Sequence, residues 1–215
     1  THGLLLVLAG LTMLSGVFGA ASQFEMRAIL SFHIVSQIGY MLMGLGLQTE
    51  LALAGTIFFL IHNMIAKSNL FLVSGAVLHL KGTTQLKQLG GLYRERPLLS
   101  VLFLLSAMSL AGVPPLSGFV AKLLLIMAAL RAEQWLVCGV GLFVGIWTLY
   151  SMTKIWANGF WASEPEERVV VEPVSRRREL LLLAPVAVLA LLTVLVGVGG
   201  VAVFEVCREA AGQLL

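Results

Sequence analysis

The sequence is dominated by long apolar runs, each about as long as a membrane is thick, separated by short charged segments. A helix that crosses the hydrocarbon core needs about 20 apolar residues, at a rise of about 1.5 Å each. Within a bilayer, only helices and closed barrels satisfy all their backbone hydrogen bonds. We therefore expect an all-α integral membrane protein, a single polytopic domain over residues 1–215 formed as a bundle of about seven transmembrane helices. The expected helices cover residues 3–22, 28–49, 51–80, 98–112, 115–131, 134–160 and 180–206.

The composition supports the membrane class and excludes several kinds of site. Of the 215 residues, 59% are hydrophobic and only 12% are charged, whereas about 25% of the residues in a soluble domain are charged. The net charge of +3 comes from basic residues between the apolar runs, so it indicates topology rather than nucleic-acid binding. Cys138 and Cys207 form no CxxC motif, and no nucleotide-binding or zinc motif is present. We expect neither a metal site nor a cofactor.

The start of the chain and its charge distribution give two further expectations. The chain begins at Thr1 and enters an apolar run without the basic start of a signal peptide, so we expect an N-terminal portion of the protein to precede it. If all seven runs cross the membrane, one side collects more basic residues in total. The other side holds the dense triplet 176–178 next to the last run, so the positive-inside rule is not decisive.

Lys67 is the most informative residue, because it lies in the middle of the run 51–80. A lysine at the centre of a membrane helix costs about 2.5–3.5 kcal/mol on insertion scales. It should therefore face the bundle interior or a hydrated cavity, since its ammonium is too far from the run ends to reach the interface. A purely structural buried ion pair is the alternative.

His62 and Asn63 precede Lys67 by one or two helical turns. Asn63 and Lys67 are four residues apart and share a helix face, and Ser74 extends that face. His62 lies off this face unless the helix is locally kinked. An imidazole, a lysine and small polar groups are what a proton path through a membrane requires. For His62, an interhelical hydrogen bond is the competing interpretation.

Lys122 is a second lysine inside an apolar run, and it follows the pair Pro114-Pro115 by seven residues. Two prolines remove two backbone donors, so we expect the helix to break there. Transporters place ion sites at broken helices, where protein or water must satisfy the exposed backbone groups. Because removal from water disfavours the charged form of a lysine, we hypothesise that Lys67 and Lys122 release and take up protons. A merely packed kink is the alternative.

A polar stripe follows one face of the run 28–49, at the spacing i, i+3, i+4 and i+7. Its members are His33, Ser36, Gln37 and Tyr40. We include His33 and Ser36 in the predicted proton or cation path, although such groups equally serve to join membrane helices. Lys154, near the end of the run 134–160, is better explained as a lysine that reaches to the interface.

Three stretches together resemble a known family. They are Arg27–Tyr40, Ile61–Leu72, and the Gly90-Gly91 loop that leads through Pro114-Pro115 to Lys122. With them, nearly the whole chain resembles the antiporter-like subunits shared by Mrp-type multisubunit Na⁺/H⁺ antiporters and respiratory complex I. Relatives often have a histidine where this chain has Asn63, with His62 one residue earlier.

The resemblance implies a place for the chain in a larger assembly. The chain would be helices eight to fourteen, the C-terminal half of a fourteen-helix subunit, with Lys67 on the tenth helix and Lys122 on the broken twelfth, both on the proton path. The family topology puts both termini outside and the triplet 176–178 in the cytoplasm. It also implies a multi-pass location in the bacterial cell membrane and assembly with other subunits of a hetero-oligomeric complex.

We therefore expect a non-enzymatic transporter subunit that translocates H⁺ and Na⁺ or another monovalent cation. The alternative is a proton-pumping subunit of a complex I-type NADH:quinone oxidoreductase or of a membrane hydrogenase. Lys122 favours the antiporter, because one similar complex I subunit has glutamate there, and another has lysine but continues into a lateral helix that we do not expect here. A scaffold subunit would have no need of two buried lysines.

Overall fold

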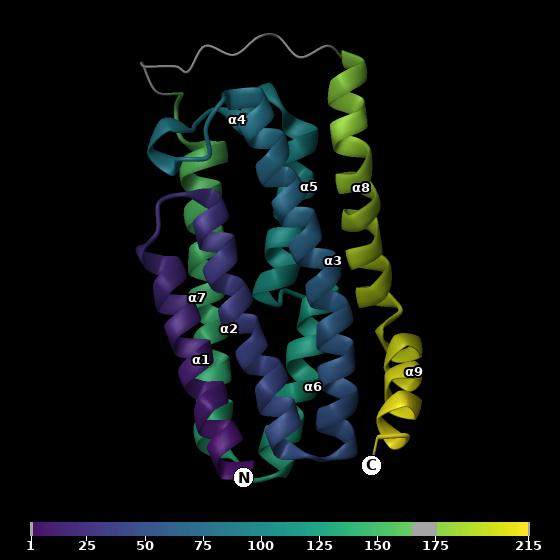
Figure 1. Ribbon diagram of the computed structural model, residues 1–215. Coiled ribbons are helices and arrows are strands. Elements are labelled where there is room, and N and C mark those ends of the chain that lie inside the picture. Colours follow the sequence, from purple (N-terminus) through teal and green to yellow (C-terminus); the bar gives the residue numbers. More distant parts are fainter. Residues whose placement is uncertain (1, 165–175, 215) are drawn as a thin grey trace.

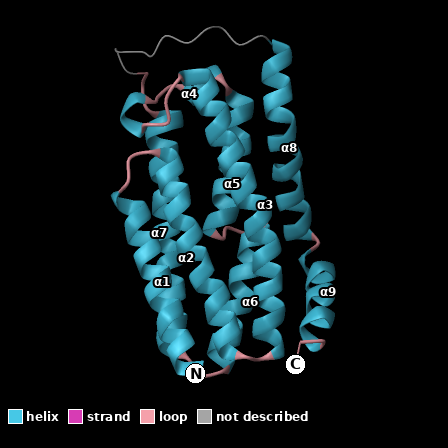
Figure 2. Cartoon of the chain, in the orientation of Figure 1, coloured by secondary structure: helices cyan, strands magenta, loops and turns pink. Residues whose placement is uncertain are grey.

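The computed structural model describes residues 2–164 and 176–214 (Figure 1). Residues 165–175, in the charged segment before the last predicted helix, lie outside the described residues. In the described part all long elements are helices that run along one bundle axis (Figure 2). They are α1 (His2–Ser22), α2 (Met26–Leu47), α3 (Glu50–Lys81), α4 (Leu92–Glu95), α5 (Pro97–Ala111), α6 (Ser117–Arg131), α7 (Trp135–Ile155), α8 (Arg176–Val198) and α9 (Gly200–Gly212), with a 3₁₀ turn η1 (Leu86–Gln88) and a π-helical segment η2 (Trp156–Trp161). The prediction of an all-α membrane bundle is confirmed.

The helix ends follow local capping chemistry. The Glu25 carboxylate accepts a hydrogen bond from the amide of Ala28 at 2.6 Å and caps the start of α2. The Thr49 hydroxyl does the same for Ala52 at 3.2 Å, at the start of α3. Side-chain oxygens at these positions satisfy amides that have no partner inside the helix. At the other end of α3, Gly82 adopts φ 71°, a left-handed conformation that glycine adopts without strain.

Helices α5 and α6 together form one interrupted span rather than two separate ones. Each has 15 residues, a length of about 22 Å that is too short for a hydrocarbon core of about 30 Å. Figure 1 shows them one above the other, and both pack against α3. The predicted break at Pro114-Pro115 is confirmed, because α5 ends at Ala111 and α6 begins at Ser117. The expectation that the runs 98–112 and 115–131 each cross the membrane is corrected accordingly.

The last predicted helix, 180–206, is divided in the structure. Helix α8 ends at Val198, and α9 begins at Gly200 after a single intervening glycine. Glycine is a weak helix former, and Gly197 has a specific packing role. A Cβ atom added there would lie 2.3 Å from the carbonyl oxygen of Pro115. The end of α8 therefore lies directly against the break between α5 and α6.

Because α5 and α6 form one span, most of the basic residues lie at one end of the bundle. The two described termini lie at the same end of the bundle (Figure 1). Arg131 in the last turn of α6 and Arg208 within α9 lie toward this end. The opposite end carries a larger set: Arg27, Lys81, Lys87, Arg94, Arg96, Arg177 and Arg178. The positive-inside rule therefore favours this opposite end as the cytoplasmic one, which is the orientation that the family resemblance implies.

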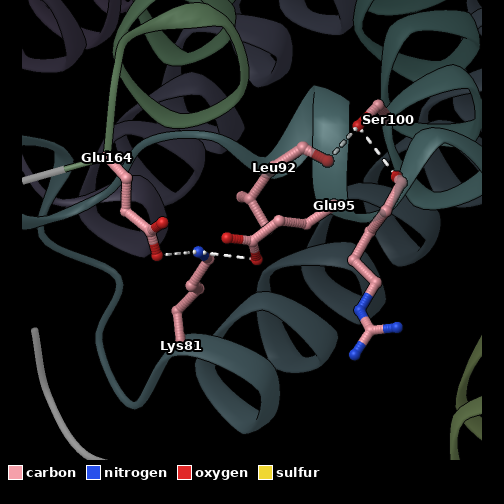
Figure 3. A network of polar contacts seen from close by, with 6 residues as sticks. Lys81, Leu92, Glu95, Ser100 and Glu164 are labelled. Carbon is pink, nitrogen blue, oxygen red and sulfur yellow. Dashed lines mark hydrogen bonds and ion pairs between the residues drawn. The ribbon is translucent and has the colours of Figure 1, made fainter.

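A polar network closes this basic end of the bundle (Figure 3). The Lys81 ammonium, at the end of α3, lies between the carboxylates of Glu95 and Glu164, at 2.8 and 3.0 Å. The Ser100 hydroxyl donates to the backbone carbonyl of Leu92 at 3.2 Å. Because Lys81 is 14% exposed, its two ion pairs are less screened than those of a fully exposed lysine. They join α3, α4 and the segment that follows η2.

The apolar core consists of two clusters, one toward each end of the bundle. The first includes Ala20, Met26 and Leu92 near the basic end, and the second includes Ala9 and Leu53 near the described termini. The break between α5 and α6 lies at mid-height between these ends (Figure 1). Buried polar residues of α3, α5 and α6 gather around this break.

We predict that Gly16→Ala separates α1 from α2, because a Cβ atom at Gly16 would lie 2.3 Å from the backbone nitrogen of Ser36. Overpacking of this kind costs about 1–3 kcal/mol, so the thermal unfolding midpoint of the detergent-solubilised full-length protein should fall. Gly10→Ala on the same helix is the matched control, since a Cβ atom there meets nothing within 4 Å. Equal midpoints for the two variants would contradict this account of the α1–α2 contact.

Candidate functional site

Lys122 caps the broken end of α5. Its ammonium donates to the backbone carbonyls of Leu110 and Ala111, both at 2.9 Å, and its side chain is buried. The last carbonyls of a helix have no partner within the helix and carry partial negative charge. The lysine comes from the second turn of α6 and reaches back across the break. The break thus creates the acceptors that allow a lysine at this depth.

Two serines and a histidine extend this polar centre toward α3. The Ser117 hydroxyl, at the start of α6, lies 2.8 Å from Nδ1 of His62 and 3.2 Å from the Ser109 hydroxyl. The backbone amide of Gly118 donates to the Ser109 hydroxyl at 3.4 Å. The side chains of His62, Ser109 and Ser117 are all fully buried. His62 therefore faces the broken helix, and its partner comes from α6.

Lys67 lies on α3, five residues after His62, and its side chain is also buried. Its ammonium donates to the backbone carbonyl of Leu30 on α2 at 2.8 Å. Two residues further along α3, the Asn69 amide donates to the Ser106 hydroxyl of α5 at 2.5 Å. Lys67 thus points between α2 and α3, whereas Lys122 points to the end of α5. The two lysines act electrostatically on each other and on both buried histidines.

The predicted stripe on α2 is buried, but its members have different neighbours. Both ring nitrogens of His33 and both amide atoms of Gln37 are buried and have no hydrogen-bond partner among the described residues. The backbone and Cβ of Ser36 lie against Gly16 of α1, so Ser36 is at a helix contact. Tyr40 lies with its ring 5.6 Å from the Lys122 ammonium. The stripe therefore contacts α1 through Ser36 and lies beside Lys122 through Tyr40.

Asn63 and Lys154 have different surroundings in the structure. Asn63 is half-buried, and its buried side-chain oxygen has no partner within the described part of the chain. The Lys154 ammonium donates to the carbonyls of Ala21 and Gln23, at 2.7 and 2.5 Å. It also lies over the Phe24 ring, 4.4 Å from the centroid. Lys154 thus holds the end of α1 and does not simply reach to the interface.

The site includes residues that the sequence pattern did not single out. Ser106, Ser109, Ser117 and Asn69 are buried here but are not part of the path predicted from the sequence. Small polar residues within apolar runs on both sides of a proline break are a signal that could have identified the serines. Among residues 2–164 and 176–214, no cluster of three or more His, Cys, Asp or Glu side chains is arranged to hold a metal ion. The chemistry available is proton transfer between lysine, imidazole and hydroxyl groups.

Comparison with known sequences places this site in a family. The family model for the NADH:quinone oxidoreductase/Mrp antiporter transmembrane region matches residues 1–148. The chain is 46% identical over its whole length to the D subunit of the Na⁺/H⁺ antiporter of Alkalihalophilus pseudofirmus, and 35% identical to that of Bacillus subtilis. It covers 43% of each of these proteins, so it spans less than half the length of the curated relatives it matches. It corresponds to their C-terminal half.

Solved structures support the same assignment. A chain in the structure of the Mrp complex from Dietzia sp. matches with a TM-score of 0.90 and 38% identity, covering 100% of this chain and 47% of that one. A chain of respiratory complex I from Thermus thermophilus with bound NADH matches with a TM-score of 0.83 and 25% identity, covering 100% of this chain and 45% of that one. The bacterial relatives and the apolar helices place the chain as a multi-pass protein of the bacterial cell membrane. The chain belongs to the NADH:quinone oxidoreductase/Mrp antiporter family of membrane subunits.

Proposed function

We propose that the chain is the C-terminal part of a subunit that exchanges protons for Na⁺ or another monovalent cation, with protons relayed through Lys67 and Lys122. The observation that carries the proposal is the pair of buried lysines, each bonded to helix carbonyls at 2.8–2.9 Å. Both lysines lie on helices that also contribute the polar contact between His62 and Ser117. A membrane lysine that is neither at the interface nor at the surface indicates an ion or proton path.

The surroundings of Lys122 suit a group that changes its charge. The carbonyls of Leu110 and Ala111 stabilise the ammonium when it is protonated. When it is neutral, the amine still has two N–H donors for the same two carbonyls, and the amides of Gly112 and Val113 close the preceding turn by donating to the carbonyls of Met108 and Ser109. The break can therefore accept either form of the lysine without refolding. This tolerance is a property that a relay requires of each member.

A route between the two lysines is supported by the polar groups between them. Ser109 and Ser117 can each donate and accept a proton, and His62 is a titratable group beside them. His33, Gln37 and Asn63 add buried polar atoms without partners in the described chain. Buried polar groups of this kind are ordinarily satisfied by internal water. We therefore infer a hydrated route that passes His62 and His33, with Asn63 at its side.

Further subunits are part of the proposal. The relatives named above are subunits of Na⁺/H⁺ antiporters, and the solved matches come from an Mrp complex and from complex I. We propose that this chain likewise acts within a hetero-oligomeric membrane complex and carries no redox chemistry itself. The second candidate, a proton-pumping subunit coupled to quinone reduction, is favoured by the match to complex I. The higher identity to the antiporter subunits favours exchange.

Alanine substitution of each lysine tests the proposed exchange. In everted membrane vesicles that contain the full-length complex, Lys67→Ala and Lys122→Ala should each abolish cation-dependent dissipation of a pH gradient, because each removes a proton-carrying group. Lys87→Ala is the matched control, since Lys87 is exposed in η1 and should leave the rate unchanged. Assembled alanine variants that exchange cations at the wild-type rate would refute the relay. Quinone reduction by NADH that depends on this subunit would establish the second candidate.

A second prediction concerns the hydroxyl contact at the break. Ser117→Ala removes the partner of His62 Nδ1 and of the Ser109 hydroxyl, and we expect exchange to slow about tenfold, since a buried hydrogen bond contributes about 1 kcal/mol or somewhat more. Ser31→Ala is the control, because the Ser31 hydroxyl is exposed and bonds only to its own helix at Arg27. Initial rates of cation-dependent proton uptake measure both variants. Equal rates would show that the proton route does not pass Ser117.

A further inference from the structure

In the described part of the chain, the aromatic ring that lies against the Lys122 ammonium is that of Tyr40. The ammonium lies over its ring, 5.6 Å from the centroid, within the distance of about 6 Å at which a cation is attracted to the negative face of a ring. Tyr40 is 1% exposed and Lys122 is 9% exposed. Such an attraction is stronger between desolvated groups than at a surface.

The ring of Tyr40 is fixed by contacts on other sides. Its hydroxyl donates to the backbone carbonyl of Gly141 on α7. Its plane stacks on Phe59 with centroids 5.2 Å apart and an interplanar angle of 24°. Phe59 in turn meets the imidazole of His62 edge to face at 5.9 Å. A ring that is held from α3 and α7 cannot follow the lysine, so the lysine must come to the ring.

The ammonium has room to lie elsewhere. A cavity of about 320 Å³ adjoins the break, and its lining includes Tyr40, Lys122, Gly112, Gly141 and Gly145. The glycines leave space beside the lysine side chain, which has four rotatable bonds. The carbonyls of α5 hold the Lys122 ammonium on one side, and the face of the Tyr40 ring attracts it on another. Together they favour one position of the ammonium within this cavity.

The titratable neighbours of Lys122 become cations when they are protonated, so they cannot stabilise its ammonium and the face of the Tyr40 ring matters more. Lys122 acts electrostatically on three titratable side chains, His33 from α2 and His62 and Lys67 from α3. When any of these is protonated it repels the ammonium. The attraction that holds Lys122 therefore comes from the two α5 carbonyls and the Tyr40 ring.

We propose that Tyr40 is a positioning residue that holds the protonated form of Lys122 at the broken end of α5. The inference rests on the proposed proton exchange and adds a residue that sets the pH range in which Lys122 is charged. A purely structural Tyr40 would only fill space between α2, α3 and α7. The two roles differ in one respect, because only the positioning role depends on the negative face of the ring.

The pH profile of exchange separates these roles. In the full-length complex, Tyr40→Phe keeps the ring and should retain the wild-type profile. Tyr40→Leu removes the ring face, so Lys122 loses its proton at lower pH, and the alkaline limb of the profile should move toward lower pH by about one unit. Incorporation of phenylalanines with increasing numbers of ring fluorines at position 40 keeps the shape and weakens the ring face. The shift should then grow with each added fluorine, whereas a profile that does not respond to fluorination would overturn the inference.

A transport-independent measurement keeps the inference separate from the proposed function. Thermal unfolding midpoints of the purified complex are compared for Tyr40→Leu, Lys122→Met and the double variant. If the ring holds the ammonium, the losses are not additive, and the double variant should melt at least about 2 °C higher than their sum predicts. Additive losses would overturn the inference. Coupling in this cycle, together with a wild-type complex that exchanges no cation for protons, would refute the proposed function and leave the role of Tyr40 in place.

Discussion

The bonds from the Lys122 ammonium to the end of α5 are the interaction on which the centre of this bundle depends. A helix that stops inside a membrane leaves carbonyls that lipid cannot satisfy, and a lysine buried at the same depth has a charge that lipid cannot solvate. Each is costly alone, and the two offset each other at 2.9 Å. The arrangement also explains the packing around it. Gly197 of α8 and Gly118 of α6 both lie so close to the break that a Cβ atom would meet backbone oxygen.

The polar middle of the bundle is organised by two lysines in different settings. Lys122 lies at a helix end, where the backbone provides free acceptors. Lys67 lies inside the uninterrupted helix α3 and takes the carbonyl of Leu30 from a neighbouring helix. His62 and Ser117 make the contact between α3 and α6. Apolar clusters flank this layer toward both ends of the bundle and lower the local dielectric constant, so the charged groups interact strongly with one another.

Much of the fold could be predicted from the sequence, because membrane helices have a simple length and composition. The break at Pro114-Pro115 and the burial of Lys67 and Lys122 follow from the cost of removing backbone donors and of placing a charge in lipid. The end-to-end arrangement of α5 and α6 could not be predicted from the pattern. Taken alone, a 15-residue apolar run indicates a short separate span. Only the position of the next helix shows that the two share one crossing. Counting α5 and α6 as two separate spans also reverses the side of the membrane that is assigned to every basic residue after the break. Glycines 197, 199 and 200 read as part of an apolar run, although Gly197 serves a contact with residues far away in sequence.

The partners of the site residues could not be predicted from spacing. Helical periodicity placed Asn63 and Ser74 on the face of Lys67 and His62 off it. In the structure His62 is the residue bonded across to α6, and the Ser74 hydroxyl accepts from Arg27 at 3.3 Å. Ser109 and Ser117 become neighbours only because the chain turns back at the break. Lys154 resembled an interface lysine in sequence, yet it caps α1, because the end of α7 lies beside the turn between α1 and α2. These contacts depend on which helices pack together.

The central claim is that Lys122 acts by giving up and regaining its proton, beyond its role as a cap for α5. Arginine keeps the positive charge and the donors but does not lose its proton in a protein. The most direct test is therefore cation-driven proton uptake by proteoliposomes that contain the full-length complex with Lys122→Arg. We expect a complex that assembles with near wild-type thermal stability and has lost exchange. An arginine variant that exchanges cations for protons at the wild-type rate would show that Lys122 is only a structural cap, and the proton path would have to lie elsewhere.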